Sequence, residues 1–115
     1  RRRHSFPTRR SSDLELAGSI GANIRPDIYK KTAELGFWLG EHYWNRGIAT
    51  EAVKEFCAYC FEELQMNRIS ARVFEENISS TKVLQKAGFQ FQCVLRKEII
   101  KNEIVHDALL FDLIR

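Results

Sequence analysis

One stretch near the middle of the chain combines residue types that can hold a phosphate. Residues 41–51 read Glu-His-Tyr-Trp-Asn-Arg-Gly-Ile-Ala-Thr-Glu. They follow an alternating apolar run at 33–39, typical of a strand, and precede apolar residues at helical spacing. A helix N-terminus offers unpaired N–H groups and a partial positive charge, Gly47 lets the backbone approach a ligand closely, and Arg46 adds a charged donor. We therefore expect a pyrophosphate cradle where the helix begins near Ile48.

The spacing of this turn separates it from two common phosphate-binding loops. A P-loop requires Gly-x-x-x-x-Gly-Lys-Ser/Thr, and a dinucleotide fold requires Gly-x-Gly-x-x-Gly. Neither pattern occurs in the chain. An ordinary turn containing one glycine is the alternative interpretation, and the choice depends on residues further along the chain.

Two motifs carry a resemblance to a known family. Residues 44–49, Trp-Asn-Arg-Gly-Ile-Ala, resemble the coenzyme A loop of the GNAT superfamily of N-acetyltransferases, Gln/Arg-x-x-Gly-x-Gly/Ala. Trp44 departs from the usual Gln or Arg. The Rim-type branch, which acetylates ribosomal-protein N-termini, often has an aromatic there followed by Gly-x-Ala-Thr-Glu-Ala, as at 47–52. Residues 77–80, Asn-Ile-Ser-Ser, with 83–89, Val-Leu-Gln-Lys-Ala-Gly-Phe, are similar to the family's Asn-x-Ala-Ser…Leu-x-Lys-x-Gly-Phe signature.

The resemblance implies acetyl-CoA as cosubstrate and a site without metal. It implies that pantetheine and the thioester lie against the backbone of strand 33–39. It also implies that the pyrophosphate lies in the loop at 45–50 and that the side chain of Asn77 contacts pantetheine. The implied cofactor-binding residues are Phe37, Trp38, Leu39, Trp44, Asn45, Arg46, Gly47, Ile48, Ala49, Thr50 and Asn77. Helix capping is the competing role for Asn77 and Ser80.

The implied reaction is direct transfer of an acetyl group to a primary amine. Ser80 would protonate the leaving thiolate, and a base must take the amine proton. Glu34, Glu41 and Glu98 are candidate bases, of which we select Glu41, with a water chain to bulk solvent as the alternative. His42 and His106 are expected to be structural. The acceptor is open: protein N-termini, polyamines and aminoglycosides all remain.

The periodicity predicts the elements that must position these residues. We expect a mixed α/β sheet in which strands 33–39 and 68–74 are parallel, because a helix connects them. In the family this pair diverges at its carboxyl ends to admit pantetheine, so the resemblance predicts the C-terminal part of a GNAT fold. The expected elements are strand 15–24, loop 25–31, strand 33–39, helix 48–64, strand 68–74, a helix capped by Asn77 and ended at Gly88, strand 89–96, a turn at 101–103 and strand 104–114.

The three cysteines, Cys57, Cys60 and Cys93, form no disulfide framework. Cys57-x-x-Cys60 could be a metal or redox pair, but no second ligand pair exists and both lie inside the predicted helix, so we interpret them as packing residues. An odd cysteine count fits a reduced, cytoplasmic setting. The apolar runs are too short for a transmembrane helix.

The first fourteen residues distort the charge balance. Residues 4–14 resemble a translated reading frame of a widely used sequencing adapter, so we interpret 1–14 as a disordered, non-native leader and 15–115 as a partial GNAT domain. The leader holds five Arg and one Asp; removing them from totals of 18 basic and 15 acidic residues leaves 13 and 14. The net charge changes from +3 to −1, which argues against nucleic-acid or membrane partners. A homodimer is left open.

Two other functions compete with an active N-acetyltransferase. One is a CoA-binding module that has lost transfer activity and acts by association. The other is an α/β interaction domain without a cofactor. Binding of acetyl-CoA distinguishes the last from the first two, and turnover with an amine distinguishes the first two from each other.

Overall fold

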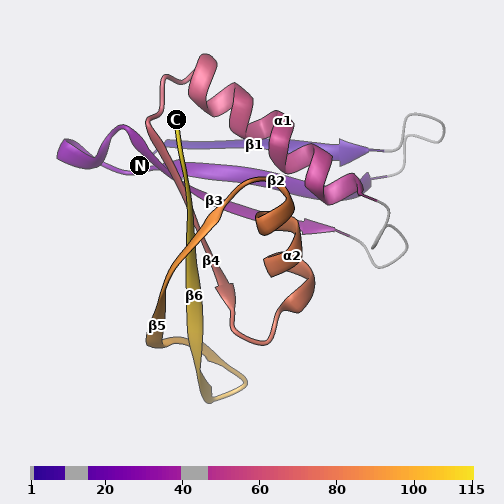
Figure 1. The fold of residues 1–115 in the computed structure, drawn as a ribbon, viewed down its shortest axis with the longest axis vertical. Coiled ribbons are helices and arrows are strands. Elements are labelled where there is room, and N and C mark those ends of the chain that lie inside the picture. Colours follow the sequence, from indigo (N-terminus) through magenta and orange to yellow (C-terminus); the bar gives the residue numbers. More distant parts are fainter. Residues whose placement is uncertain (1, 10–15, 40–46) are drawn as a thin grey trace.

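The computed structural model describes residues 2–9, 16–39 and 47–115, with side chains at 18–38 and from 47 onward. Six strands form one sheet in the order β1-β2-β3-β4-β6-β5 (Figure 1). The elements are β1 (Arg2–Arg9), β2 (Leu16–Ile24), the 3-10 helix η1 (Asp27–Tyr29), β3 (Thr32–Leu39), α1 (Ile48–Glu62), β4 (Arg68–Phe74), α2 (Ile78–Lys86), β5 (Gln90–Lys101) and β6 (Ile104–Ile114).

The predicted connections around the sheet centre are confirmed. β2 and β3 form an antiparallel hairpin, with Ile24 opposite Ala33. β3 and β4 are parallel, as the strand–helix–strand order requires. β6 then pairs antiparallel with both β4 and β5. The fold is the mixed α/β sheet that the sequence predicted.

The central parallel pair separates part of the way along its length. Pairing between β3 and β4 runs from Thr32 opposite Arg68 to Leu35 opposite Ala71 and then stops. β3 nevertheless continues to Leu39, still paired with β2, and β4 continues to Phe74, still paired with β6. The predicted divergence is therefore confirmed. We call the space between β3 and β4 beyond Leu35 and Ala71 the gap.

The predicted disorder of residues 1–14 is wrong for residues 2–9. These form β1, which pairs antiparallel with β2 from Arg2 opposite Ile24 to Arg9 opposite Leu16. Backbone pairing depends little on side-chain identity, and the outer edge of β2 would otherwise expose a row of unpaired N–H and C=O groups. The sheet therefore has six strands rather than five. The adapter origin of the leader stays a prediction.

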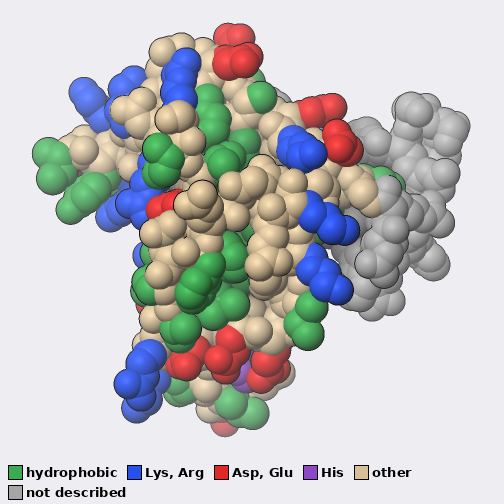
Figure 2. Space-filling view, in the orientation of Figure 1, with side chains coloured by type: hydrophobic (Ala, Val, Ile, Leu, Met, Phe, Trp, Pro, Cys, Tyr) green, Lys and Arg blue, Asp and Glu red, His purple; other side chains and the backbone are tan. Residues whose placement is uncertain are grey.

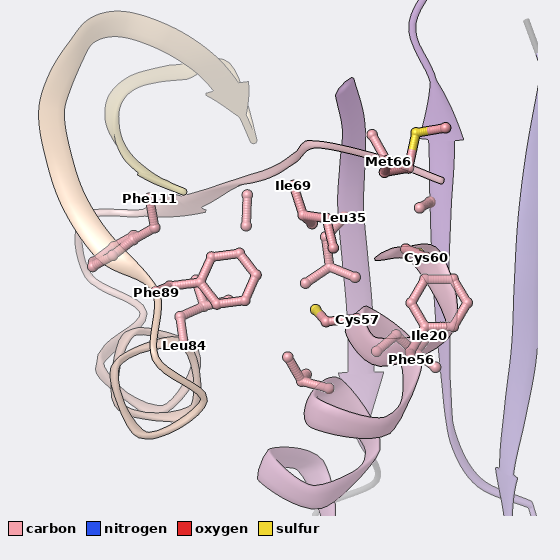
Figure 3. Close-up of a cluster of buried hydrophobic side chains, with 14 of the residues drawn as sticks. Ile20, Leu35, Phe56, Cys57, Cys60, Met66, Ile69, Leu84, Phe89 and Phe111 are labelled. Carbon is pink, nitrogen blue, oxygen red and sulfur yellow. The ribbon is translucent and has the colours of Figure 1, made fainter. Parts of the chain in front are cut away.

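Both helices pack on one face of the sheet and share one hydrophobic core. α1 contributes a stripe at helical spacing, Phe56 and Cys60 among it, and α2 contributes Leu84 (Figure 3). The sheet side chains that meet them alternate along their strands, as Leu35 and Ile69 do. The alternation at 33–39 thus predicted the buried face of β3 correctly.

The end of α2 follows the predicted geometry. Gly88 adopts a left-handed φ of +99°. The N–H of Phe89 donates to the Leu84 carbonyl at 2.9 Å and that of Gly88 to the Gln85 carbonyl at 3.1 Å. These two bonds form a Schellman motif, which directs Phe89 back onto Leu84 in the core.

β5 departs from the simple alternation expected at 89–96. Its pairing with β6 shifts register between Phe91 and Cys93 and again between Leu95 and Ile99. At the second bulge Lys97 has a φ of +57°, and its N–H donates to Asp107 Oδ1 at 2.8 Å. Because β5 is the outer strand, both of its faces are largely exposed. Bulges are a common means of blocking further pairing at such an edge.

Charged side chains pair across the sheet face opposite the helices. Ion pairs there link neighbouring elements: Arg25 with Glu34 at 3.6 Å, Arg68 with Asp112 at 3.0 Å and Arg72 with Glu98 at 3.5 Å. The helix-bearing face instead shows groups of hydrophobic side chains (Figure 2). No helix within the described ranges is long and apolar enough to cross a membrane.

Cys57 and Cys60 lie on the buried face of α1, in the hydrophobic core. Burial, together with the neighbouring Cys60, raises the pKa of the Cys57 thiol to about 12, and burial raises that of Cys60 to about 11. Within the described part of the chain no group of three or more potential ligands could hold a metal ion. The cysteines therefore serve as small apolar packing residues in this core.

We predict that these two thiols make the protein less stable in alkali. The native state keeps both protonated, whereas unfolded thiols ionise near their ordinary pKa of 9.0. Above that pH the native state binds more protons than the unfolded state, so the free energy of unfolding falls, by about 1.4 kcal/mol per pH unit for each thiol. Urea unfolding between pH 8 and about 11 measures the slope. Cys57→Ala should reduce it by one thiol's share, and an unchanged slope would contradict the burial argument.

Candidate functional site

α1 begins at Ile48, where the sequence predicted that the helix after the loop would start. Gly47 is the N-cap residue, in a left-handed conformation with φ +74°, and the Glu51 N–H donates to its carbonyl at 3.0 Å. Among the described residues no side chain caps this helix, and nothing lies within 4 Å of a Cβ placed at Gly47. The N–H groups of Ile48, Ala49 and Thr50 have no acceptor within the helix. This terminus can therefore receive an anion.

Part of the predicted loop cannot be compared with the structure. Glu41, His42, Trp44, Asn45 and Arg46 lie outside the described residues. Leu39 is described as the last residue of β3, opposite Gly18, without its side chain.

A hollow connects the start of α1 with the carboxyl half of β3. It is shallow and partly open to solvent. Phe37 and Trp38 of β3 line it together with Ala49 of α1, so the structure brings these predicted residues side by side. The remaining lining residues are Ser19, Ile20, Ala52 and Val53.

In the gap, the side of β3 that faces β4 has backbone groups without a partner strand. Beyond Leu35, the N–H and C=O groups of β3 that point toward β4 have no partner on that strand. Phe37 and Trp38 lie in this segment. An extended ligand chain could pair with these groups as an added strand would.

Asn77 and Ser80 lie at the start of α2, directly after the carboxyl end of β4. The Asn77 Oδ1 accepts a hydrogen bond from the Ser80 N–H at 3.0 Å, so Asn77 caps the helix. The amide Nδ2 of Asn77 and the hydroxyl of half-buried Ser80 make no hydrogen bond to described residues. Capping therefore accounts for one atom of Asn77 and leaves its amide donor free.

The start of α1, the start of α2 and the gap all lie at the carboxyl ends of the parallel strands β3 and β4. The start of α1 follows β3, the start of α2 follows β4, and the gap lies between the two strands (Figure 1). Ligands of open α/β sheets bind beyond the carboxyl ends of parallel strands, where the connections separate.

The two described candidate bases are each paired with an arginine. Glu34 lies in the part of β3 that still pairs with β4, opposite Ser70, and contacts Arg25. Glu98 contacts Arg72 on the sheet face opposite the helices. Glu34 is therefore away from the gap, whereas Glu98 lies on the strand beyond β6.

His106 has surroundings that sequence spacing did not indicate. Its Nδ1 lies 3.8 Å from Glu76 Oε1, and its ring meets the ring of Phe74 edge-on, with centroids 5.5 Å apart. Pairing of β6 with β4, Phe74 opposite Ala108, brings them together. The three residues are up to 32 positions apart in the chain, and no local pattern links them.

Comparison with known proteins gives consistent matches. A family model described as an acetyltransferase (GNAT) domain matches residues 3–90, which includes most of the predicted leader. The "Probable N-acetyltransferase YjcK" of Bacillus subtilis is 39% identical over 99 residues, covering 84% of this chain and 54% of that protein. The ribosomal-protein-serine acetyltransferase of Escherichia coli is 28% identical over 97 residues, covering 84% and 54%.

A solved structure extends the likeness to three dimensions. The microcin C7 self-immunity acetyltransferase MccE, in complex with acetyl-CoA and AMP, matches with a TM-score of 0.80 and 26% identity. The match covers 89% of this chain and 56% of that one. The chain thus spans about half the length of the relatives it matches. With a family model matched over most of its residues and its fold shared, the chain belongs to the GNAT acetyltransferase family.

Proposed function

We propose that this protein transfers an acetyl group from acetyl-CoA to a primary amine, on a protein N-terminus or a small molecule, by direct attack of the amine. The observation that carries the proposal is the early end of β3–β4 pairing, which opens the gap beside the uncapped start of α1. A diphosphate and an extended thioester arm require these two features in adjacent places.

The cofactor is assigned to the site in two parts. The pyrophosphate accepts hydrogen bonds from the first N–H groups of α1, beside Gly47, with Arg46 as an added cation. The pantetheine arm lies in the gap and pairs with β3 near Phe37 and Trp38. The free amide donor of Asn77 approaches the arm from the start of α2.

The chemistry then needs three groups. A base removes the amine proton, and we assign this to Glu41, with Glu98 and a water chain as alternatives. Backbone N–H groups of β3 stabilise the tetrahedral oxyanion, each typically worth about 10²–10³ in rate. The Ser80 hydroxyl protonates the departing thiolate of coenzyme A.

A module that binds acetyl-CoA without transferring the acetyl group is the second candidate, since the cradle alone does not require turnover. The primary test is thermal unfolding with excess acetyl-CoA. Binding at a concentration 100-fold above Kd stabilises the native state by about 2.7 kcal/mol. No stabilisation rejects both candidates, and stabilisation without release of free thiol in the presence of amines selects the inactive module.

Gly47→Glu is expected to abolish this stabilisation. The substitution adds a side chain and a negative charge at the start of α1, where the phosphates sit, and forces a non-glycine residue into a left-handed conformation. Ala58→Glu is the matched control, since it adds the same charge on the exposed side of the same helix. If folded Gly47→Glu still gains stability from acetyl-CoA, the loop assignment is wrong.

Ser80→Ala is expected to lower turnover, by about 10²-fold, with little change in acetyl-CoA affinity. The Asn77 cap uses the backbone N–H of residue 80, so the substitution leaves α2 intact. Release of thiol and the ligand-induced thermal shift are measured in parallel. Turnover equal to that of the unmodified chain would remove Ser80 from the mechanism.

A further inference from the structure

Two nitrogen-bearing side chains of the β5–β6 hairpin contact the ring of Phe74. Lys101 places its Nζ 5.1 Å from the ring centroid, as in a cation–π contact. His106 meets the same ring edge-on, at an interplanar angle of 87°. An amine and an imidazole therefore contact one aromatic residue.

This ring lies at the edge of the gap. Phe74 is the last residue of β4 and stands three residues beyond Ala71, where pairing with β3 ends. At roughly 3.3 Å per residue the separation along the strand is about 10 Å. The chain then continues through Glu76 to the Asn77 cap of α2. Lys101, which reaches Phe74 from the β5–β6 hairpin, therefore places its amine at the end of β4 that leads into the Asn77 cap.

The turn of the β5–β6 hairpin fixes the backbone of Lys101 near Phe74. Lys101 pairs with Ile104, and a two-residue turn joins them. Asn102 and Glu103 both have positive φ, 51° and 64°, as a type I′ turn requires. Lys101 therefore starts from a backbone position set by the tight turn, and its flexible four-carbon stem supplies the reach.

His106 is placed to accept a proton. Its side chain is 19% exposed, and its Nδ1 faces the Glu76 carboxylate at 3.8 Å. We assign the role of proton acceptor to Nε2, the ring nitrogen that does not face Glu76. Two charged groups nearby contact other partners: Arg72 pairs with Glu98, and the Asp107 carboxylate accepts a hydrogen bond from the Lys97 N–H. Acidic side chains gather at this end of the molecule (Figure 2).

We propose that Lys101 is a self-acetylation site, where the chain modifies its own ε-amine with the acetyl-CoA it binds. The inference rests on the proposed function and names an acceptor for the same site. His106 Nε2 takes one proton from the ε-ammonium. The free amine attacks the thioester carbonyl, the C–N bond forms, and the C–S bond breaks with its electron pair on sulfur. The amine's second proton goes to solvent and the thiolate is protonated.

The modification changes the contacts of the hairpin. Acetylation converts the ammonium to a neutral amide and removes the cation–π attraction to Phe74. The ring face, which the unmodified chain occupies with its own amine, becomes available to an external ammonium.

The test is mass spectrometry of the full chain incubated with acetyl-CoA. Lys101 should be acetylated at least about tenfold faster than Lys97, an exposed lysine of the same hairpin that serves as matched control. The fraction modified at a given time should not depend on protein concentration, because the transfer is intramolecular. Lys101→Arg keeps the cation over the ring and should show no label at that position.

His106→Gln separates proton transfer from packing. It should lower Lys101 labelling by about 10²-fold while leaving the thermal stability and the acetyl-CoA shift unchanged. Added imidazole should restore part of the labelling in His106→Ala, which a purely structural role would not allow.

The contradicting outcomes separate the two proposals. Equal labelling of Lys97 and Lys101, or labelling that accelerates with protein concentration, overturns self-acetylation. So does an unlabelled Lys101 in a chain that binds acetyl-CoA and acetylates an added amine, which leaves the proposed function standing. Absence of any acetyl-CoA shift removes both.

Discussion

The structure depends on a parallel pair of strands that stops pairing before either strand ends. β3 and β4 share only the segment up to Leu35 and Ala71, yet each remains in the sheet because β2 and β6 hold their outer sides. Unpaired backbone groups are costly unless water or a ligand satisfies them. The interruption therefore leaves backbone groups that a ligand can satisfy, between strands that are held in the sheet by continuous pairing on both flanks.

The two helices place their N-termini beside the gap. Their apolar stripes meet in one core around Phe56, Cys57 and Leu84, which anchors both helix starts at the carboxyl ends of the parallel strands. α2 is capped by Asn77, whereas α1 begins at Gly47 with no side-chain cap among the described residues. One terminus thus has its N–H groups partly satisfied internally, whereas the first N–H groups of the other are available to an external acceptor.

Sequence patterns predicted what is local or periodic. The alternation at 33–39, the stripe of α1, the Asn77 cap and the Gly88 end of α2 follow from spacing and residue type, and the parallel pairing follows from chain connectivity. The side-chain cluster around Phe74 could not be predicted, because the register between β4 and β6 brings His106 to it across the sheet. β1 was missed because backbone pairing needs no side-chain pattern.

Hydrogen–deuterium exchange with and without acetyl-CoA shows whether a ligand lies between β3 and β4, since it reports which amides the ligand covers. We expect slower exchange at two separate segments, residues 36–39 on the gap side of β3 and 48–50 at the start of α1. The edge strand β5 should be unaffected. Protection of α1 without any change at 36–39, or none in either segment, would contradict a cofactor arm lying between the diverging strands.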